Sequence, residues 1–352
     1  MSNEKKKFNW KAVTQHHLFL PIVCLLVVLL VNVIKTPDFF VISMKGGVLY
    51  GYLVDVVNRA SELVIVAIGM TLVTAASGGQ DISVGAVMAV AASVCCQILS
   101  GGQVSTDTLM NSMALAIIAA IIAGRCGAFN GFLVANLGIQ AMVATLILYP
   151  AGRGIAQLVT KGQITYVRVD SFKVMGGYIG KCPIPTPIFF AIAAIILINI
   201  ILKKTALGLY IESVGINGSA SRLVGLNSTM IKFLTYVICG VLAGVAGIVA
   251  SSRIYSADAN NIGLNLEMDA ILAVALGGNV LSGGKFSIMV SRSLMTLTTT
   301  LYAMAVSADQ LPVYKAIVVI IIVVIQSPVF RRNMEAWKQK RALRNKAMEG
   351  GH

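Results

Sequence analysis

The side chains that most often do chemistry in proteins are few in this chain and do not gather in a reactive pattern. The three histidines, His16, His17 and His352, all lie near the ends of the chain. None of the six cysteines belongs to a Cys-x-x-Cys pair, so the sequence lacks the ligand spacing of a zinc site. The Gly-x-Ser-x-Gly turn of hydrolases and the His-Glu-x-x-His motif are also absent. The sequence therefore predicts no enzyme, no bound metal and no cofactor.

One motif typical of ATPases occurs in this chain by coincidence. Residues 99–103 read LSGGQ, the signature of ABC-type ATPases. Such an ATPase also needs a phosphate-binding loop of the form GxxxxGK[ST]. The Gly-Lys pair at Gly284-Lys285 is followed by Phe286, and Asn279 stands where the first glycine should be. We therefore do not expect the chain to bind nucleotide.

The most informative polar residues stand where an apolar run is interrupted. Residues 77–85 read SGGQDISVG, so two glycines end one run and Asp81 directly precedes the next. Asp81 suits a helix N-cap, because its carboxylate accepts hydrogen bonds from the free N–H groups of the first turn. A helix interrupted at membrane depth must line a cavity or be buried in protein. Two interpretations stay open for Gln80, Asp81 and Ser83: a helix cap and a substrate path.

Two loops are rich in polar residues. In residues 203–227, Asn217 or Ser219 is placed to cap a short amphipathic helix that ends at Gly225. This loop is either a solvated connector or a helix that docks on another subunit. Residues 258–269 read DANNIGLNLEMD, and their amides and carboxylates suit a polyhydroxylated ligand, although they suit a solvated loop equally well.

The composition predicts the elements that must position these residues. Hydrophobic residues make up 57% of the 352-residue chain and charged residues 12%, with a mean hydropathy of +0.83. A soluble domain carries about 25% charged residues. The net charge of +14 is concentrated at the two tails, which is typical of cytosolic ends rather than of a nucleic-acid-binding groove. We expect an all-α polytopic membrane protein that binds no nucleic acid.

Apolar runs predict about ten membrane spans, since a helix needs roughly 20 apolar residues to cross a bilayer. The even count and the basic tails place both termini in the cytosol. The predicted organisation is a tail at residues 1–17, a transmembrane domain at 18–330 and a second tail at 331–352. The expected spans lie near residues 18–34, 61–77, 83–99, 109–125, 137–151, 184–202, 231–250, 267–281, 287–306 and 312–330.

The two halves of the chain share one spacing. Glu62 opens an apolar run that reaches Gly78-Gly79 sixteen residues later, and Glu267 opens another that reaches Gly283-Gly284 after the same interval (62 to 78, and 267 to 283). Transporters are often built from such repeats, with interrupted helices at corresponding positions. The pattern favours two related halves.

Four separated segments resemble one family of permeases. SGGQDISVG, NGFLVANLGIQAMVATL, IESVGINGSASRLVGLN and LEMDAILAVALGGNVLSGGKF occur in the order found in permease subunits of ribose-, xylose- and galactose-type ABC importers. The resemblance covers roughly residues 62–330 and is greatest to the galactofuranose-type permeases, through segments such as ATLILYPAGRGIAQLVTKGQI and SADANNIGLNLEMDAILAV. Ile82 departs from the leucine that is frequent in the family.

The resemblance implies a sugar-importing subunit of the bacterial inner membrane. It implies partners that the sequence itself does not show: an ATP-hydrolysing subunit, an extracytoplasmic sugar-binding protein, and a second permease that is either a copy or a paralogue. The residues expected to couple to the ATPase are Glu212, Gly215, Ala220 and Gly225. The residues expected along the substrate path are Gln80, Asp81, Ser83, Asn130, Asn136, Glu267 and Asp269. The alternative is a carrier or facilitator that works alone.

Overall fold

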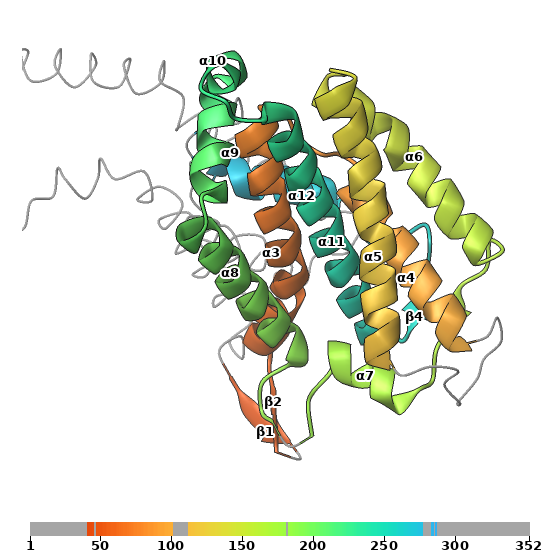
Figure 1. Cartoon of the computed structure of the whole chain (residues 1–352). Coiled ribbons are helices and arrows are strands. Elements are labelled where there is room, and N and C mark those ends of the chain that lie inside the picture. Colours follow the sequence, from red (N-terminus) through yellow and green to blue (C-terminus); the bar gives the residue numbers. More distant parts are fainter. Residues whose placement is uncertain are drawn as a thin grey trace, which may run out of the picture.

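The computed structural model of the protein describes residues 41–45, 47–100, 112–180, 182–276, 283–284 and 286 (Figure 1). Three expected spans, at 18–34, 287–306 and 312–330, and both basic tails lie outside these residues. The expected span at 267–281 is described only as far as Leu276.

Within the described residues the chain is mainly helical. Two short antiparallel strand pairs, β1 (Ser43–Lys45) with β2 (Val48–Tyr50) and β3 (Thr165–Tyr166) with β4 (Ser256–Ala257), join loops at one end of the bundle (Figure 1). The helices are α3 (Tyr52–Ser77), α4 (Val84–Ser100), α5 (Ser112–Gly131) with the π-helical turn η2 (Phe132–Asn136), α6 (Ala141–Val159), α7 (Asp170–Gly176), α8 (Thr186–Lys204), α9 (Leu207–Ile216), α10 (Gly218–Leu223), α11 (Ser228–Ile254) and α12 (Leu266–Leu276).

Five helices among the described residues are long and apolar enough to cross a membrane. Their spanning segments are Val57–Ser77, Met113–Asn136, Ala141–Val159, Thr186–Lys204 and Ser228–Ile254. They correspond to five of the expected spans. Helix α6, which contains Pro150, continues to Val159, beyond the expected end at residue 151. The expected span at 83–99 forms α4, which has 17 residues and is shorter than the others.

Helices α3 and α11 lie at the centre and the other long helices cover them. The most apolar window of α3 is 94% buried and that of α11 67%, whereas those of α5, α6 and α8 are 28–33% buried. On α5, Met113, Ile117 and Ile121 recur every four residues with more than half of each side chain exposed. Because that spacing places them on one face of the helix, this face suits the hydrocarbon of a bilayer.

Small residues allow the central helices to approach closely. A Cβ added to Gly127 of α5 would overlap the backbone of Tyr236 and Gly240 in α11, and one added to Gly240 would overlap Gly127 in return. Such small-residue contacts are common between membrane helices, where packing has to replace the hydrophobic drive for association. They fix α11 against α5, and α5 supplies one residue of the site described next.

Candidate functional site

The interruption between α3 and α4 is closed by its own polar groups. Gly78 ends α3 with a φ of +66°, and its N–H donates to the Thr74 carbonyl at 3.0 Å. The Asp81 Oδ1 atom then accepts from the Ser83 N–H at 2.9 Å and from the Ser83 hydroxyl at 2.6 Å. Asp81 therefore fixes the turn that leads into α4 by accepting from Ser83, the residue before the helix, whereas the sequence predicted bonds to the N–H groups of the first helical turn.

Two other helices contribute hydrogen bonds to this turn before α4. The Asn130 Nδ2 atom of α5 donates to the Ser83 hydroxyl oxygen at 2.7 Å and lies 3.5 Å from Asp81 Oδ1. The Thr145 hydroxyl oxygen of α6 accepts from the Ile82 N–H at 3.1 Å. Asp81, Ser83 and Asn130, which we call the polar break cluster, are at most 2% exposed. In this conformation the cluster is sealed, so a substrate can reach it only after the helices around it move.

The other expected path residues do not belong to the polar break cluster, and they differ in burial and position. Gln80 is half-buried beside it, whereas Asn136 is exposed at the end of η2 and does not join it. Glu267 and Asp269 are buried in the first turn of α12. A Cβ added to Gly85 would overlap a carboxylate oxygen of Glu267, which places that carboxylate beside the first turn of α4.

The expected coupling segment reaches the same interruption through backbone contacts. The Gly284 N–H donates to the Ala75 carbonyl in the last turn of α3 at 3.0 Å. A Cβ added to Gly215, in α9, would overlap both of those groups. A Cβ added to Gly283 would lie 3.2 Å from the Gly78 Cα atom. We call Ala75, Gly78, Gly215, Gly283 and Gly284 the glycine joint, because its four glycines leave room for this close backbone contact with the Ala75 carbonyl group.

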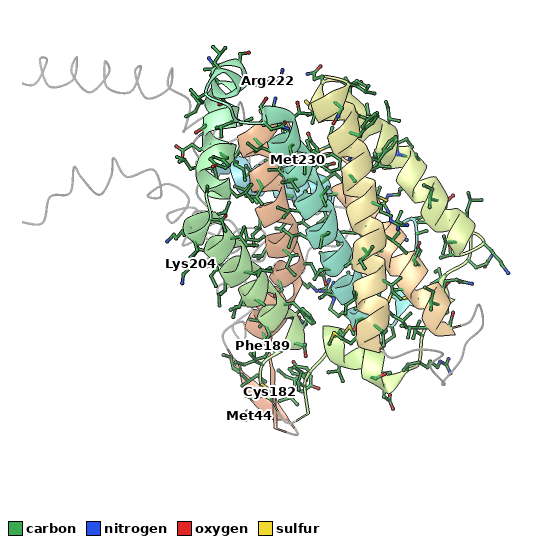
Figure 2. The ribbon with its side chains drawn as sticks, in the orientation of Figure 1. Met44, Cys182, Phe189, Lys204, Arg222 and Met230 are labelled. Atoms are coloured by element: carbon green, nitrogen blue, oxygen red, sulfur yellow. The ribbon has the colours of Figure 1, made fainter. Side chains whose placement is uncertain are left out.

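Beyond the joint, α9 and α10 project from one end of the bundle. Asn217 caps α10 by accepting from the N–H groups of Ser219 and Ala220 at 3.1 and 3.0 Å. Arg222 anchors α10 to α11 by donating to the hydroxyl oxygens of Ser228 and Thr229. Figure 2 shows Arg222 at this end, and Met44 and Cys182 at the opposite one.

The tip of α10 exposes apolar side chains. Leu223 is 90% exposed and Val224 77% exposed, and Ile216 at the end of α9 is 64% exposed. Ala220 is exposed beside them, Glu212 is half-buried, and Gly225 follows with a φ of +87°. Exposed apolar side chains on a projecting helical hairpin are typical of a protein-docking surface.

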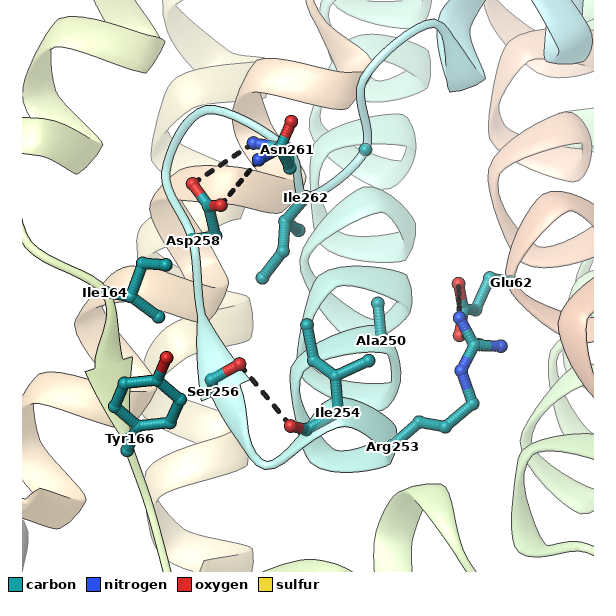
Figure 3. A pocket seen from close by; sticks show the side chains of 11 residues that line it. Glu62, Ile164, Tyr166, Ala250, Arg253, Ile254, Ser256, Asp258, Asn261 and Ile262 are labelled. Carbon is teal, nitrogen blue, oxygen red and sulfur yellow. Dashed lines mark hydrogen bonds and ion pairs between the residues drawn. The ribbon is translucent and has the colours of Figure 1, made fainter. Parts of the chain in front are cut away.

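A polar cavity of about 280 Å³ lies at the opposite end (Figure 3). On one side, Arg253 of α11 forms an ion pair with Glu62 of α3, with 2.9 Å between Nη1 and Oε1. On the other side, Tyr166 of β3 faces the loop that contains Asp258 and Asn261.

Arg153 of α6 holds this loop in place. Its Nη1 atom donates to the carbonyl oxygens of Ala259, Asn260 and Ile262 at 2.9, 3.0 and 2.9 Å. The loop is thus a positioned element rather than a solvated connector.

Comparisons with known proteins agree with this architecture. Residues 52–326 match the family described as the branched-chain amino acid transport system / permease component. The chain belongs to this permease family. It is 40% identical to the galactofuranose transporter permease protein YtfT of Escherichia coli K12 over 330 residues, which cover 93% of each chain.

Two further relatives share the length of the permease. The chain is 37% identical to the fructose import permease protein FruF of Bifidobacterium longum, over 93% of this chain and 92% of the relative. It is 33% identical to the ribose import permease protein RbsC of Escherichia coli K12, over 87% and 92% respectively. No solved structure matches the chain. The permease is thus a multi-pass membrane component of a transport system and not an enzyme.

Sequence reasoning missed several residues of the permease that the structure places in or near these sites. Thr145 stands inside an apolar run, where a threonine is most simply explained by packing. Arg153 lies beyond the expected end of the span at residue 151, whereas the structure continues α6 to Val159. The sequence did contain a signal for Glu62, which opens the repeated spacing, but it did not indicate Arg253 as its partner.

Proposed function

We propose that this permease is the membrane-spanning subunit of an ATP-driven ABC importer for a monosaccharide, where it forms the translocation path and couples to a separate ATPase. The observation that carries the transport mechanism is the contact of α9 with the last turn of α3 at the glycine joint. It links a docking hairpin to the interruption that the polar break cluster seals. The sugar class rests on the three relatives named as sugar permeases.

The exposed apolar tip of α10 supports a role as the docking element for the ATPase, and we propose on this ground that the α9–α10 end lies in the cytosol. The end with β1–β4 and α7 is then external and receives a sugar-binding protein. We propose that ATP is bound and hydrolysed by the partner subunit only, and that this chain binds no cofactor. The importer holds two permeases, either two copies of this chain or one copy and a paralogue.

We also propose about ten helices in two related halves, with both termini cytosolic in a bacterial inner membrane. The proximity of Gly78 to Gly283 supports this arrangement, because the two glycine pairs that share a spacing in the sequence meet in space. In this arrangement Asp269 lies in the second-half segment that matches the one before Asp81, and both carboxylates face inward.

The test is reconstitution of the permease with its ATPase and binding protein in lipid vesicles. We expect uptake of radiolabelled galactofuranose, fructose or ribose that requires ATP hydrolysis and all three components. A stand-alone carrier is not favoured by relatives that are named as import permeases. It would instead transport sugar without the ATPase and respond to an ion gradient, and that result would overturn the proposal.

A further inference from the structure

The cavity at the end opposite α10 has the size of a site for one small ring. Its volume of about 280 Å³ is slightly below the range of about 300–1,000 Å³ that is typical of small-molecule sites. Its lining comes from α3, β3, the end of α11 and the loop after β4, so it lies where several elements converge (Figure 3). A disaccharide would fill more than this space.

The charges of the lining disfavour an anionic ligand. Glu62 and Arg253 neutralise each other in their ion pair. Asp258 is the remaining ionisable acid among the lining residues, so the cavity carries a net negative charge. The nearby cation Arg153 is directed to three carbonyl oxygens of the loop. A carboxylate or phosphate would therefore meet repulsion here, whereas hydroxyl groups would not.

The polar groups are held in place before any ligand arrives. Asp258 Oδ1 accepts from the N–H groups of Asn260 and Asn261 at 2.9 and 3.3 Å, and its Oδ2 accepts from Asn261 Nδ2 at 2.6 Å. A carboxylate has about four lone-pair positions, so it can accept further hydrogen bonds from hydroxyl groups. Tyr166 is 52% exposed and presents a flat ring on which the C–H face of a sugar can pack.

We propose that this cavity binds neutral single-ring sugars on the external side of the membrane, before they reach the polar break cluster. The proposal rests on the proposed function for its sidedness and for the class of ligand. Binding has to be weak, because a site on a transport path must also release what it holds.

The test measures how sugars protect a cysteine placed in the cavity. Ile164 lines the cavity and is 45% exposed, and Ile164→Cys keeps the Tyr166 ring. In the complete importer this variant is labelled in intact cells with a membrane-impermeant maleimide, with the parent chain as background. We expect ribose, fructose or galactose to slow labelling about fourfold at about three times Kd, because protection follows 1 + [L]/Kd. Galacturonate, which has the ring of galactose and a negative charge, should protect much less, as should lactose.

Two variants control for general effects of sugar and for the charge argument. Tyr50→Cys lies at the same end but does not line the cavity, and its labelling should not change with sugar. Combining Ile164→Cys with Asp258→Asn removes the net charge of the cavity, so galacturonate should then protect as well as galactose.

The outcomes separate this proposal from the proposed function. Equal protection at positions 50 and 164, or none at 164, overturns the cavity proposal while ATP-driven sugar uptake by the parent importer still supports the proposed function. Labelling of Ile164→Cys only after the membrane is permeabilised overturns the external location. Absence of any sugar uptake by the parent importer overturns both.

Discussion

At the scale of single side chains, the Asp81 carboxylate determines the shape of the interruption between α3 and α4. It receives the N–H and the hydroxyl of Ser83 and lies within reach of Asn130, all away from water. Loss of an acceptor would leave buried donors unpaired, at a cost of about 1–3 kcal/mol for each. The interruption therefore depends on an oxygen acceptor at position 81 more than on its charge.

We expect Asp81→Asn to retain more sugar uptake than Asp81→Leu at equal abundance in the membrane. Asparagine keeps an oxygen that can accept from Ser83, whereas leucine leaves the Ser83 N–H and hydroxyl without that partner. The measurement is ATP-dependent uptake together with thermal unfolding in detergent. Equal uptake by Asp81→Leu and the parent would show that Asp81 is needed neither for the turn before α4 nor along the substrate path.

Removing one partner of the ion pair between Glu62 and Arg253 should lower stability by an amount that depends on which partner is removed. Exposed pairs are worth about 0–1 kcal/mol, and breaking a fully buried pair costs about 3–5 kcal/mol. The Glu62 side chain is 8% exposed and that of Arg253 is 23% exposed, so the pair falls between these limits.

We expect Arg253→Gln to lower the unfolding temperature more than Glu62→Gln, because the carboxylate left behind is the less hydrated partner. The double variant should cost less than the sum of the two single variants. Thermal unfolding of all four proteins in the same detergent checks this. Strictly additive costs would show that the pair contributes no coupling energy.

The sequence predicted part of the site at this scale and missed the rest for identifiable reasons. Asp81 next to two glycines is a local signal, because capping depends on adjacent residues. The contributions of Asn130 and Thr145 depend on how α5 and α6 pack, which no local pattern records. Asn136 was also expected on the path, yet it lies exposed at the end of η2.

At the scale of elements, the glycine joint is where movement of the α9–α10 hairpin would reach α3. The contact is made by backbone atoms of three separate segments, so it transmits displacement without flexible side chains between them. Gly215 and Gly225 stand at different places in this hairpin. Gly215 is packed against Ala75 and Gly284, whereas a Cβ at Gly225 would meet nothing within 4 Å.

We expect Gly215→Ala to uncouple ATP hydrolysis from sugar uptake, because its methyl group would push α9 away from the end of α3. Gly225→Asn is the matched control: asparagine tolerates a positive φ and the site is open, so coupling should persist. The measurement is the ratio of sugar transported to ATP hydrolysed in reconstituted importers. An unchanged ratio in Gly215→Ala would contradict the role of the joint.

Bulky substitutions at Gly225 test the exposed side of the α9–α10 hairpin. Gly225→Leu should disturb the positive-φ turn at a cost of about 1–3 kcal/mol and so displace α10 from its docking position. We expect reduced sugar-stimulated hydrolysis with normal membrane insertion. Unchanged stimulation in reconstituted complexes would count against a role of this turn in coupling.

Hydropathy found the long helices but not their ends. Apolar runs located α8 and α11 within a few residues, since burial in lipid or protein demands length and apolarity. They ended α5 at residue 125 and α6 at residue 151, whereas these helices continue to Gly131 and Val159. They started α3 too late, because Asp55 and Arg59 precede the apolar segment.

At the scale of the whole molecule, the proposed orientation assigns the two ends of the bundle to different compartments. We expect Asp170→Cys, in α7, to react with an impermeant thiol reagent added to intact cells. Ser219→Cys, in α10, and a cysteine in either tail should react only after permeabilisation. Both positions, 170 and 219, are exposed, so differences reflect compartment rather than burial. Labelling of a tail from outside would overturn the topology.

The central position of α3 also imposes an order on biosynthesis. α3 ends at Ser77, but α11, the helix against which it packs most extensively, begins at Ser228. At about 5–20 residues per second, translation of these roughly 150 residues takes about 8–30 s. During that time Glu62 sits in a newly inserted helix before Arg253 has been made. A ribosome that stalls before α11 therefore leaves in the bilayer a helix that lacks its principal cover, and membrane quality control has those seconds in which to recognise it.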